Sequence, residues 1–192
     1  MRFTAKSTTM MILASKSPRR IELMTLAGFD FISVPALKDE NIPDGTSPSD
    51  AVLMLSHQKA QEIAEKYPTD TVIGADTVVA LGNEIMGKPK DEQAAFDMLK
   101  KLSGKTHTVL TGVCVISPDK QINFYEKTEV EFYPLGDDEI RQYISSGEPM
   151  DKAGAYGIQE KGAMFVKRIN GDFYNVVGLP VARLARELKS LV

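Results

Sequence analysis

The 192-residue sequence contains one cysteine, Cys114, and two histidines, His57 and His107. A single cysteine cannot form an intramolecular disulfide, which suits a reducing cytoplasm. So few thiols and imidazoles cannot supply a closed structural zinc site. Cys114 lies in the apolar run 113–116, so we interpret it as a packed, inert thiol rather than a nucleophile. We expect neither histidine to have a catalytic role.

Long apolar runs, strong net charge and a common phosphate-binding motif are also missing. No run approaches the ~18 apolar residues of a membrane span, and residues 1–10 lack the apolar stretch of a signal peptide. The formal net charge is -3, which argues against general attraction to nucleic acid or membrane, so an anion must bind locally. No segment matches the P-loop pattern.

Strand and helix patterns alternate in the first half of the chain, whereas hairpin signals appear in the second. We expect helices over 18–27 and from 48 to about 67, and a strand over 71–81. Later, strands are expected to form hairpins at 118–120 and at Asn170-Gly171-Asp172, where Phe173–Val177 would be the second strand. This order predicts an α/β fold with a mixed sheet, and it is compatible with two lobes around a cleft.

The helix predicted at residue 18 begins with two arginines, in the turn where acidic residues are usual. Ser17 is expected to cap this helix, with Pro18 at its first position. Arg19 and Arg20 oppose the helix dipole unless an anion such as a phosphate chain binds at the helix start. The alternative is that both side chains reach solvent or a nearby carboxylate.

Two charged side chains occupy positions that patterning assigns to the core. Lys59 lies in the middle of the apolar stripe of the helix from 48 to 67, so it must pair, reach a polar cavity or extend to the surface. Asp76 interrupts the apolar run 71–81. Its carboxylate is either functional, at the end of a strand, or a turn aspartate that bonds its own backbone.

Three further segments carry charged or amide groups in loops. Lys88 lies in the stiff turn Gly87-Lys88-Pro89, and acidic residues occur at Asp39-Glu40. The segment 147–163 is rich in glycine and contains Gln159. It is typical of a structured loop that carries function.

Several of these stretches together resemble the Maf family. They are "LASKSPRRIELM", "IGADTVV", "GKPKD", "LSGKTHTVLTGV" and the segment from "GEPMDKAGAYGIQ" to "NVVGLP". The resemblance covers the chain from Met11 to its end, with the motifs in matching order. We therefore expect residues 11–192 to form a single domain, preceded by a disordered extension at 1–10.

The resemblance implies a fold shared with the inosine-triphosphate pyrophosphatases: a two-lobed mixed sheet with flanking helices and a deep cleft. It also implies a metal-dependent hydrolase that converts a nucleoside triphosphate and water to a nucleoside monophosphate and pyrophosphate. The tract "KAGAYGIQ", which ends at Gln159, is similar to the branch that prefers dTTP and UTP. Modified pyrimidine nucleotides are further candidate substrates.

Site residues are carried over from the family by matching positions. Asp76 corresponds to the proton acceptor, with Lys59 and Lys88 as catalytic cations, and Glu40 with Asp76 as ligands of Mg²⁺ or Mn²⁺. The residues that correspond to substrate-binding positions are Ser15, Arg19, Arg20, Thr77 and Gln159.

The expected reaction is attack of water on the α-phosphorus, in the cytoplasm, with a nucleotide as partner and neither nucleic acid nor membrane. A homodimer is a further expectation from the fold. Family members are associated with inhibition of septum formation, so one alternative is a nucleotide-regulated binding protein in cell division. A kinase or nucleotidyltransferase that binds phosphate through the same residues is the other.

Overall fold

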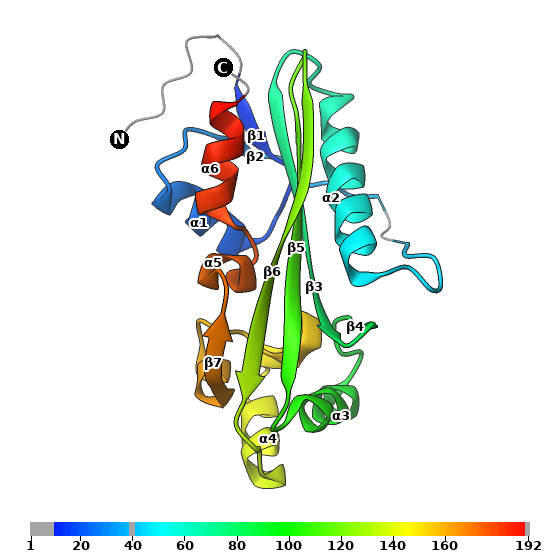
Figure 1. Ribbon diagram of the computed structural model, residues 1–192, viewed down its shortest axis with the longest axis vertical. Helices are drawn as coiled ribbons and strands as arrows, with labels where there is room; N and C mark the ends of the chain where they lie inside the picture. Colours follow the sequence, from blue (N-terminus) through cyan, green and yellow to red (C-terminus); the bar gives the residue numbers. More distant parts are fainter. Residues whose placement is uncertain (1–9, 39–40, 191–192) are drawn as a thin grey trace. The chain divides into compact units, whose positions relative to one another are not determined.

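A computed structural model describes residues 10–38 and 41–190 (Figure 1). Within them, strands and helices alternate from residue 11 to residue 81, a short strand and a helix come next, and two long neighbouring strands follow over residues 106–132. The strands are β1 (Met11–Leu13), β2 (Ile32–Ser33), β3 (Thr71–Leu81), β4 (Glu84–Met86), β5 (Thr106–Ile116), β6 (Gln121–Phe132) and β7 (Val166–Asn170). The α-helices are α1 (Pro18–Leu26), α2 (Pro48–Ala64), α3 (Glu92–Leu102), α4 (Asp137–Ile144), α5 (Phe173–Val177) and α6 (Val181–Lys189). The 3₁₀ helices are η1 (Glu148–Asp151), η2 (Ala153–Ala155) and η3 (Lys161–Phe165).

The strands in the described ranges form one seven-stranded sheet with the order β2-β1-β3-β5-β6-β7, and β4 pairs with β3. The strands β1 and β2 are parallel, as are β1 and β3, whereas β4 and β7 pair antiparallel with β3 and β6. The turn 117–120 joins the neighbouring strands β5 and β6, where the Ser117 N–H donates to the Lys120 carbonyl (2.9 Å). The predicted mixed α/β sheet is therefore confirmed.

The chain divides into two compact units. Among the described residues, unit 1 comprises 10–38, 41–76, 111–126 and 178–190, and unit 2 comprises 77–110 and 127–177. The predicted extension at 1–10 lies outside the described residues, apart from Met10. No helix in the described ranges is long and apolar enough to cross a membrane.

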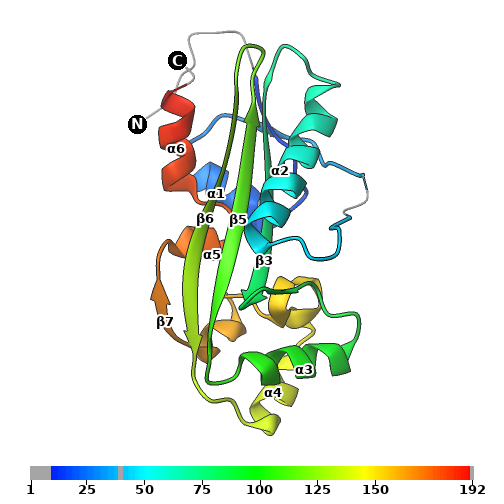
Figure 2. The same cartoon turned by 45° about the vertical axis from the view of Figure 1, so that its right-hand side comes forward.

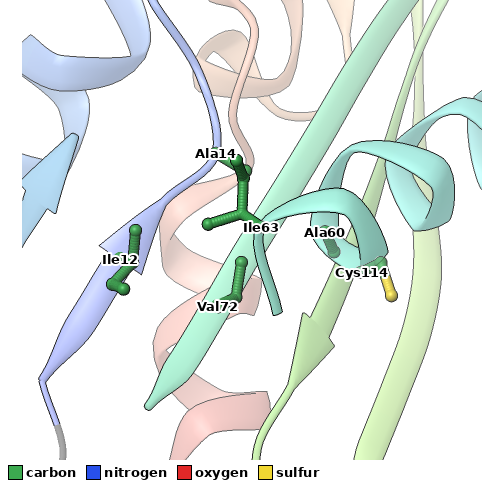
Figure 3. Packing of buried hydrophobic residues seen from close by; sticks show 6 residues of the cluster. All are labelled: Ile12, Ala14, Ala60, Ile63, Val72 and Cys114. Atoms are coloured by element: carbon green, nitrogen blue, oxygen red, sulfur yellow. The ribbon is translucent and has the colours of Figure 1, made fainter. Parts of the chain in front are cut away.

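Helices cover both faces of the strands in unit 1. Helix α2 lies on one face, and α1 and α6 lie on the other (Figures 1 and 2). Figure 3 shows the core beneath α2, in which side chains from β1, β3, β5 and α2 pack together. The members of this buried cluster are Ile12, Ala14, Ala60, Ile63, Val72 and Cys114. Cys114 is fully buried here, as predicted.

Two glycines allow α2 to lie unusually close to the strands of unit 1. A Cβ atom at Gly74 in β3 would lie 2.3 Å from the Ser56 carbonyl oxygen and 2.6 Å from the Ala60 nitrogen. A Cβ atom at Gly112 in β5 would lie 2.2 Å from the Val52 carbonyl oxygen. Any larger residue at either position would push the helix away, so these glycines fix the height of α2 above the sheet.

In unit 2, α3 packs against α4 and against the 3₁₀ helices η1 and η2. Unit 2 also contains an aromatic cluster, with edge-to-face contacts between Phe132 and both Tyr156 and Phe165. Tyr143 of α4 packs edge-on against Phe165, with ring centroids 4.8 Å apart. Such contacts give the irregular segment between α4 and β7 a rigid base.

The predicted hairpin at Asn170-Gly171-Asp172 is wrong, because Phe173–Val177 is the helix α5 rather than a strand. The Asp172 carboxylate accepts a hydrogen bond from the Tyr174 N–H (2.8 Å), as a capping residue does at a helix start. The buried Asn175 amide donates to the Val109 carbonyl (3.0 Å) and to Thr128 Oγ1 (2.9 Å). Capping and burial of Asn175 therefore override the local hairpin preference of Asn-Gly.

Candidate functional site

In unit 1, the carboxyl end of β1 leads directly into the start of α1. Ser15 is buried, and its Oγ accepts a hydrogen bond from the Ser17 N–H (3.1 Å). The Ser15 carbonyl accepts a hydrogen bond from the Ser33 hydroxyl beside it. Ser17 is the N-cap residue of α1, as predicted, with Pro18 after it, but its side chain makes no capping hydrogen bond to the helix.

The two arginines follow in the first turn of α1, which contains no acidic residue. Arg20 donates from Nε to the Gly178 carbonyl (2.8 Å) and from Nη1 to the Ala75 carbonyl (2.8 Å). These two bonds attach the start of α1 to β3 and to the segment before α6. Arg19 is half-buried in the same turn. A positively charged helix start with two guanidinium groups suits an anion such as phosphate.

Lys59 and Asp76 form an ion pair in unit 1. The Lys59 Nζ lies 2.5 Å from Asp76 Oδ1, and the side chains are 17% and 10% exposed. Side chains alternate along a strand, so Val72, Gly74 and Asp76 share the face of β3 that α2 covers. The close approach of α2 at Gly74 therefore brings Lys59 to Asp76. The alternative that Lys59 extends to the surface is not what the structure shows.

These contacts meet at neighbouring residues of β3. Arg20 binds the backbone carbonyl of Ala75, and Lys59 binds the side chain of Asp76. Ala14, just before Ser15, donates its N–H to the Ile73 carbonyl (2.8 Å) on the same strand. Unit 1 thus brings together, around residues 73–76, the predicted residues Ser15, Arg20, Lys59 and Asp76.

Glu62 is a buried carboxylate in unit 1 that sequence patterning missed. It accepts backbone N–H bonds from Leu37 and Lys38 at 3.0 Å each, and it is 5% exposed. The Lys38 N–H lowers the pKa of Glu62, against the opposing effect of burial. Glu62 follows Lys59 by one helical turn, so α2 presents both a cation and an anion inward; that spacing was the available signal. The predicted metal ligand Glu40 lies outside the described residues.

The remaining predicted residues belong to unit 2. Thr77 is half-buried on β3, next in sequence to Asp76. Lys88 is exposed in the turn after β4. The Gly87 carbonyl beside it accepts a hydrogen bond from the Gly154 N–H (3.1 Å), so this turn is attached to η2. Gln159 is exposed between η2 and η3.

The residues present would bind a hard divalent cation only if a bound ligand, such as a phosphate chain, supplied further oxygen atoms. Among the described residues, no three histidine, cysteine, aspartate or glutamate side chains are grouped as a protein-bound metal would need. Among the described residues, the Asp76 carboxylate follows Ala75, whose carbonyl accepts a hydrogen bond from Arg20 at the start of α1. Mg²⁺ commonly binds through one or two carboxylates together with substrate phosphates and water, and this donor set fits that mode.

The fold is shared with a protein of known structure. The solved structure of the Staphylococcus aureus Ham1 protein superposes with a TM-score of 0.53 at 17% identity, covering 96% of this chain and 100% of that one. At that identity the likeness concerns the fold alone, a mixed α/β sheet flanked by helices.

The family is more specific. Residues 10–191 match the Maf-like protein family, and the chain belongs to it. A Bacillus mycoides protein named dTTP/UTP pyrophosphatase is 54% identical over 178 residues, covering 93% of each chain. A Geobacillus protein of the same name is 54% identical over 181 residues, covering 94% of this chain and 97% of its own length. The resemblance to the Maf family is therefore confirmed.

Proposed function

We propose that this protein is a pyrophosphatase that hydrolyses dTTP and UTP to the nucleoside monophosphate and pyrophosphate. The observation that carries the proposal is the Lys59–Asp76 pair, beside the arginine-bearing start of α1 in unit 1. Relatives named dTTP/UTP pyrophosphatase, 54% identical over nearly their whole length, support the choice of substrate. The single, buried cysteine accords with a cytoplasmic location.

Asp76 accepts the proton of the attacking water in this mechanism. The water oxygen forms a bond to the α-phosphorus, the bond from this phosphorus to the bridging oxygen breaks, and pyrophosphate leaves with the bonding electrons. Lys59 orients the Asp76 carboxylate through the 2.5 Å contact with Oδ1. A carboxylate held in one direction performs general-base catalysis better than one that rotates freely.

The cationic side chains and the helix start stabilise phosphate charge. Arg19 contributes its guanidinium at the first turn of α1, and Ser15 contributes a hydroxyl just before it. Arg20 supports this arrangement through its two bonds to backbone carbonyls. Lys88 neutralises negative charge on the departing pyrophosphate. These roles require that substitutions affect KM and kcat to different degrees.

Gln159 and Thr77 recognise the base. The Gln159 amide carries both a donor and an acceptor, which complement the imide edge of thymine or uracil. A site built on such hydrogen bonds rejects bases that leave its polar groups unpaired. Modified pyrimidine nucleotides that retain this edge are therefore substrates as well.

The proposed substrate is the nucleotide in complex with a divalent cation, Mg²⁺ or Mn²⁺. Asp76 and Glu40 are the residues that would hold it, together with phosphate oxygens. When bound, the cation supplies charge neutralisation to the triphosphate. The fold leads us to expect a homodimer as well.

The Asp76→Asn variant tests the proposal. We expect pyrophosphate release from dTTP to fall roughly 10²-fold or more, because general-base catalysis contributes about that factor. Release is measured as pyrophosphate formed in the presence of Mg²⁺, with the nucleoside monophosphate quantified in parallel. Full activity of Asp76→Asn would exclude the assigned base.

Asp70→Asn is the matched control, since Asp70 lies just before β3 and accepts the Met10 N–H (2.9 Å) at an exposed position. We expect this variant to retain wild-type turnover. Thermal unfolding of both variants separates lost chemistry from lost folding. If dead Asp76→Asn still blocks septum formation when overproduced, a binding role exists beside the enzymatic one.

A further inference from the structure

The Glu148 carboxylate in unit 2 is hydrogen-bonded on both oxygens by the segment that carries Gln159. Its Oε1 accepts a bond from the Gly162 N–H (3.2 Å), and its Oε2 accepts one from the Lys161 N–H (3.1 Å). Bonds from backbone N–H groups to a charged carboxylate are stronger than bonds between neutral groups. The carboxyl side of the Gln159 loop is therefore fixed to η1.

Tyr143 fixes the amino side of the same loop. Its hydroxyl donates to Glu148 Oε1 (2.8 Å) and accepts a bond from the Gly157 N–H (3.2 Å). The ring is buried against Phe165. Burial and the Glu148 carboxylate raise the pKa of Tyr143 above its ordinary value, so its hydroxyl keeps the proton that it donates.

Lys152 connects the middle of the loop to the same cluster. This lysine is 7% exposed, and its ammonium donates to the Glu148 carbonyl (2.9 Å). It also lies 3.5 Å from Glu160 Oε1. Residues on both sides of Gln159 are thus attached to one group of side chains, while Gln159 itself is exposed.

We infer that Glu148 and Tyr143 are positioning residues that hold the loop 157–162 so that the Gln159 amide meets the pyrimidine base in one orientation. This inference rests on the proposed function. A loop that is already ordered loses little entropy when it binds, and its amide discriminates between base edges. In a loosened loop the Gln159 amide could rotate to suit the edge of a different base. Selectivity for the base should therefore decrease more than kcat does.

The experiment compares dTTP with dCTP, which differ at the edge that Gln159 is proposed to read. The ratio of kcat/KM for the two nucleotides is measured for the wild type, Gln159→Ala, Glu148→Gln and Tyr143→Phe. We expect the ratio to fall roughly tenfold in Gln159→Ala, the effect of one lost hydrogen bond to the base. Glu148→Gln and Tyr143→Phe should lower it in the same direction, with KM for dTTP raised and kcat within roughly twofold.

Val130→Ala is the matched control for stability. Val130 is buried in β6 of unit 2, opposite Ile169 of β7, so its truncation weakens the core and leaves the hydrogen bonds of Glu148 and Tyr143 in place. We expect this variant to lose thermal stability and to keep the wild-type selectivity ratio. The double variant Glu148→Gln/Gln159→Ala should show no further loss of selectivity beyond Gln159→Ala, because both changes act on one contact.

The outcomes separate the two proposals. If Gln159→Ala lowers the ratio and neither Glu148→Gln nor Tyr143→Phe does, the positioning role is overturned while the proposed function stands. If the wild type releases no pyrophosphate, or Gln159→Ala keeps the wild-type ratio, base reading fails and the inference fails with it. Tyr143→Phe keeps the ring that packs on Phe165, so it remains informative if Glu148→Gln does not fold.

Amide hydrogen exchange tests whether Glu148 and Tyr143 hold the loop 157–162, independently of any measurement of turnover. In the wild type we expect slow exchange at Gly157, Lys161 and Gly162, whose N–H groups bind Tyr143 and Glu148. Exchange at these positions should become faster in Glu148→Gln and Tyr143→Phe, and remain slow in Val130→Ala. Unchanged exchange in both loop variants would overturn the inference.

Discussion

At the residue scale, the charged groups that enter the core of unit 1 each contact an opposite charge or a backbone donor. Lys59 meets Asp76, and Glu62 meets the N–H groups of Leu37 and Lys38. Burying either charge alone would cost several kcal/mol. Lys59 and Glu62 both project from α2, about one helical turn apart, so this helix contributes two charged side chains to the interior of unit 1.

His107 makes the free energy of unfolding sensitive to acid. It is 1% exposed, its Nε2 lies 2.8 Å from the Tyr156 hydroxyl, and burial lowers its pKa to about 4. Between about pH 6.5 and pH 4 the unfolded chain binds a proton that folded His107 does not. Stability is therefore highest above this range, and it decreases as the pH falls, by at most about 1.4 kcal/mol per unit.

Urea unfolding across this pH range measures the effect, with His107→Phe as the test variant. We expect His107→Phe to show a shallower decrease than the wild type, because the titrating group is gone. Val130→Ala should be less stable at every pH but should keep the wild-type slope. Equal slopes in His107→Phe and the wild type would refute the assignment.

Sequence patterning predicted Lys59 and Asp76 because each breaks a clear apolar pattern. It did not predict that they bind each other, because that contact depends on how closely a helix approaches a strand. Glu148 was missed for a different reason: it lies in an irregular, glycine-rich segment whose side chains follow no period. The role of Glu148 became visible only through its bonds to backbone N–H groups.

At the element scale, the position of α2 depends on two residues without side chains. Gly74 and Gly112 leave room for the backbone of α2 at Ser56 and Val52. The sequence alone could not say which element approaches the strands at these glycines. The hairpin predicted at residues 170–172 failed because its local signal competes with a helix cap and a buried amide in α5.

Gly74→Ala should destabilise the protein and move Lys59 away from Asp76. The added methyl would lie 2.3 Å from a backbone oxygen of α2, and such overpacking costs typically 1–3 kcal/mol. Urea unfolding measures the loss, and pyrophosphate release should fall as well. Gly87→Ala is the control, since a Cβ there meets no atom within 4 Å. Wild-type stability of Gly74→Ala would contradict this account of the α2 contact.

At the scale of the whole molecule, substrate and cation are expected to bind together. A chelator should abolish pyrophosphate release, and added Mg²⁺ or Mn²⁺ should restore it. The thermal unfolding temperature of the nucleotide-free protein should not change with chelator, because the described residues contain no three-ligand group for a resident ion. Activity that persists in chelator would exclude the cation from the reaction.

The mixed sheet and most helices followed from the sequence, because apolar periodicity and Pro, Gly and Ser signals are local. The family and its substrate class followed from extended motifs, and the family match over residues 10–191 confirms the first of these. Element ends shifted by a few residues: α2 ends at Ala64 rather than near Tyr67. Tertiary contacts decide where a helix frays, and sequence does not record them directly.

The burial of Cys114 under α2 gives the chain a built-in reporter. Burial raises the pKa of this thiol to about 12, so at neutral pH the sulfur stays protonated and sealed from reagents. It lies in the cluster that contains Ala60 and Ile63 of α2 (Figure 3). A thiol-specific dye can react only when that helix lifts from the strands. The rate at which the dye labels Cys114 in the natural sequence therefore reports how often α2, which carries Lys59, moves away from the strands.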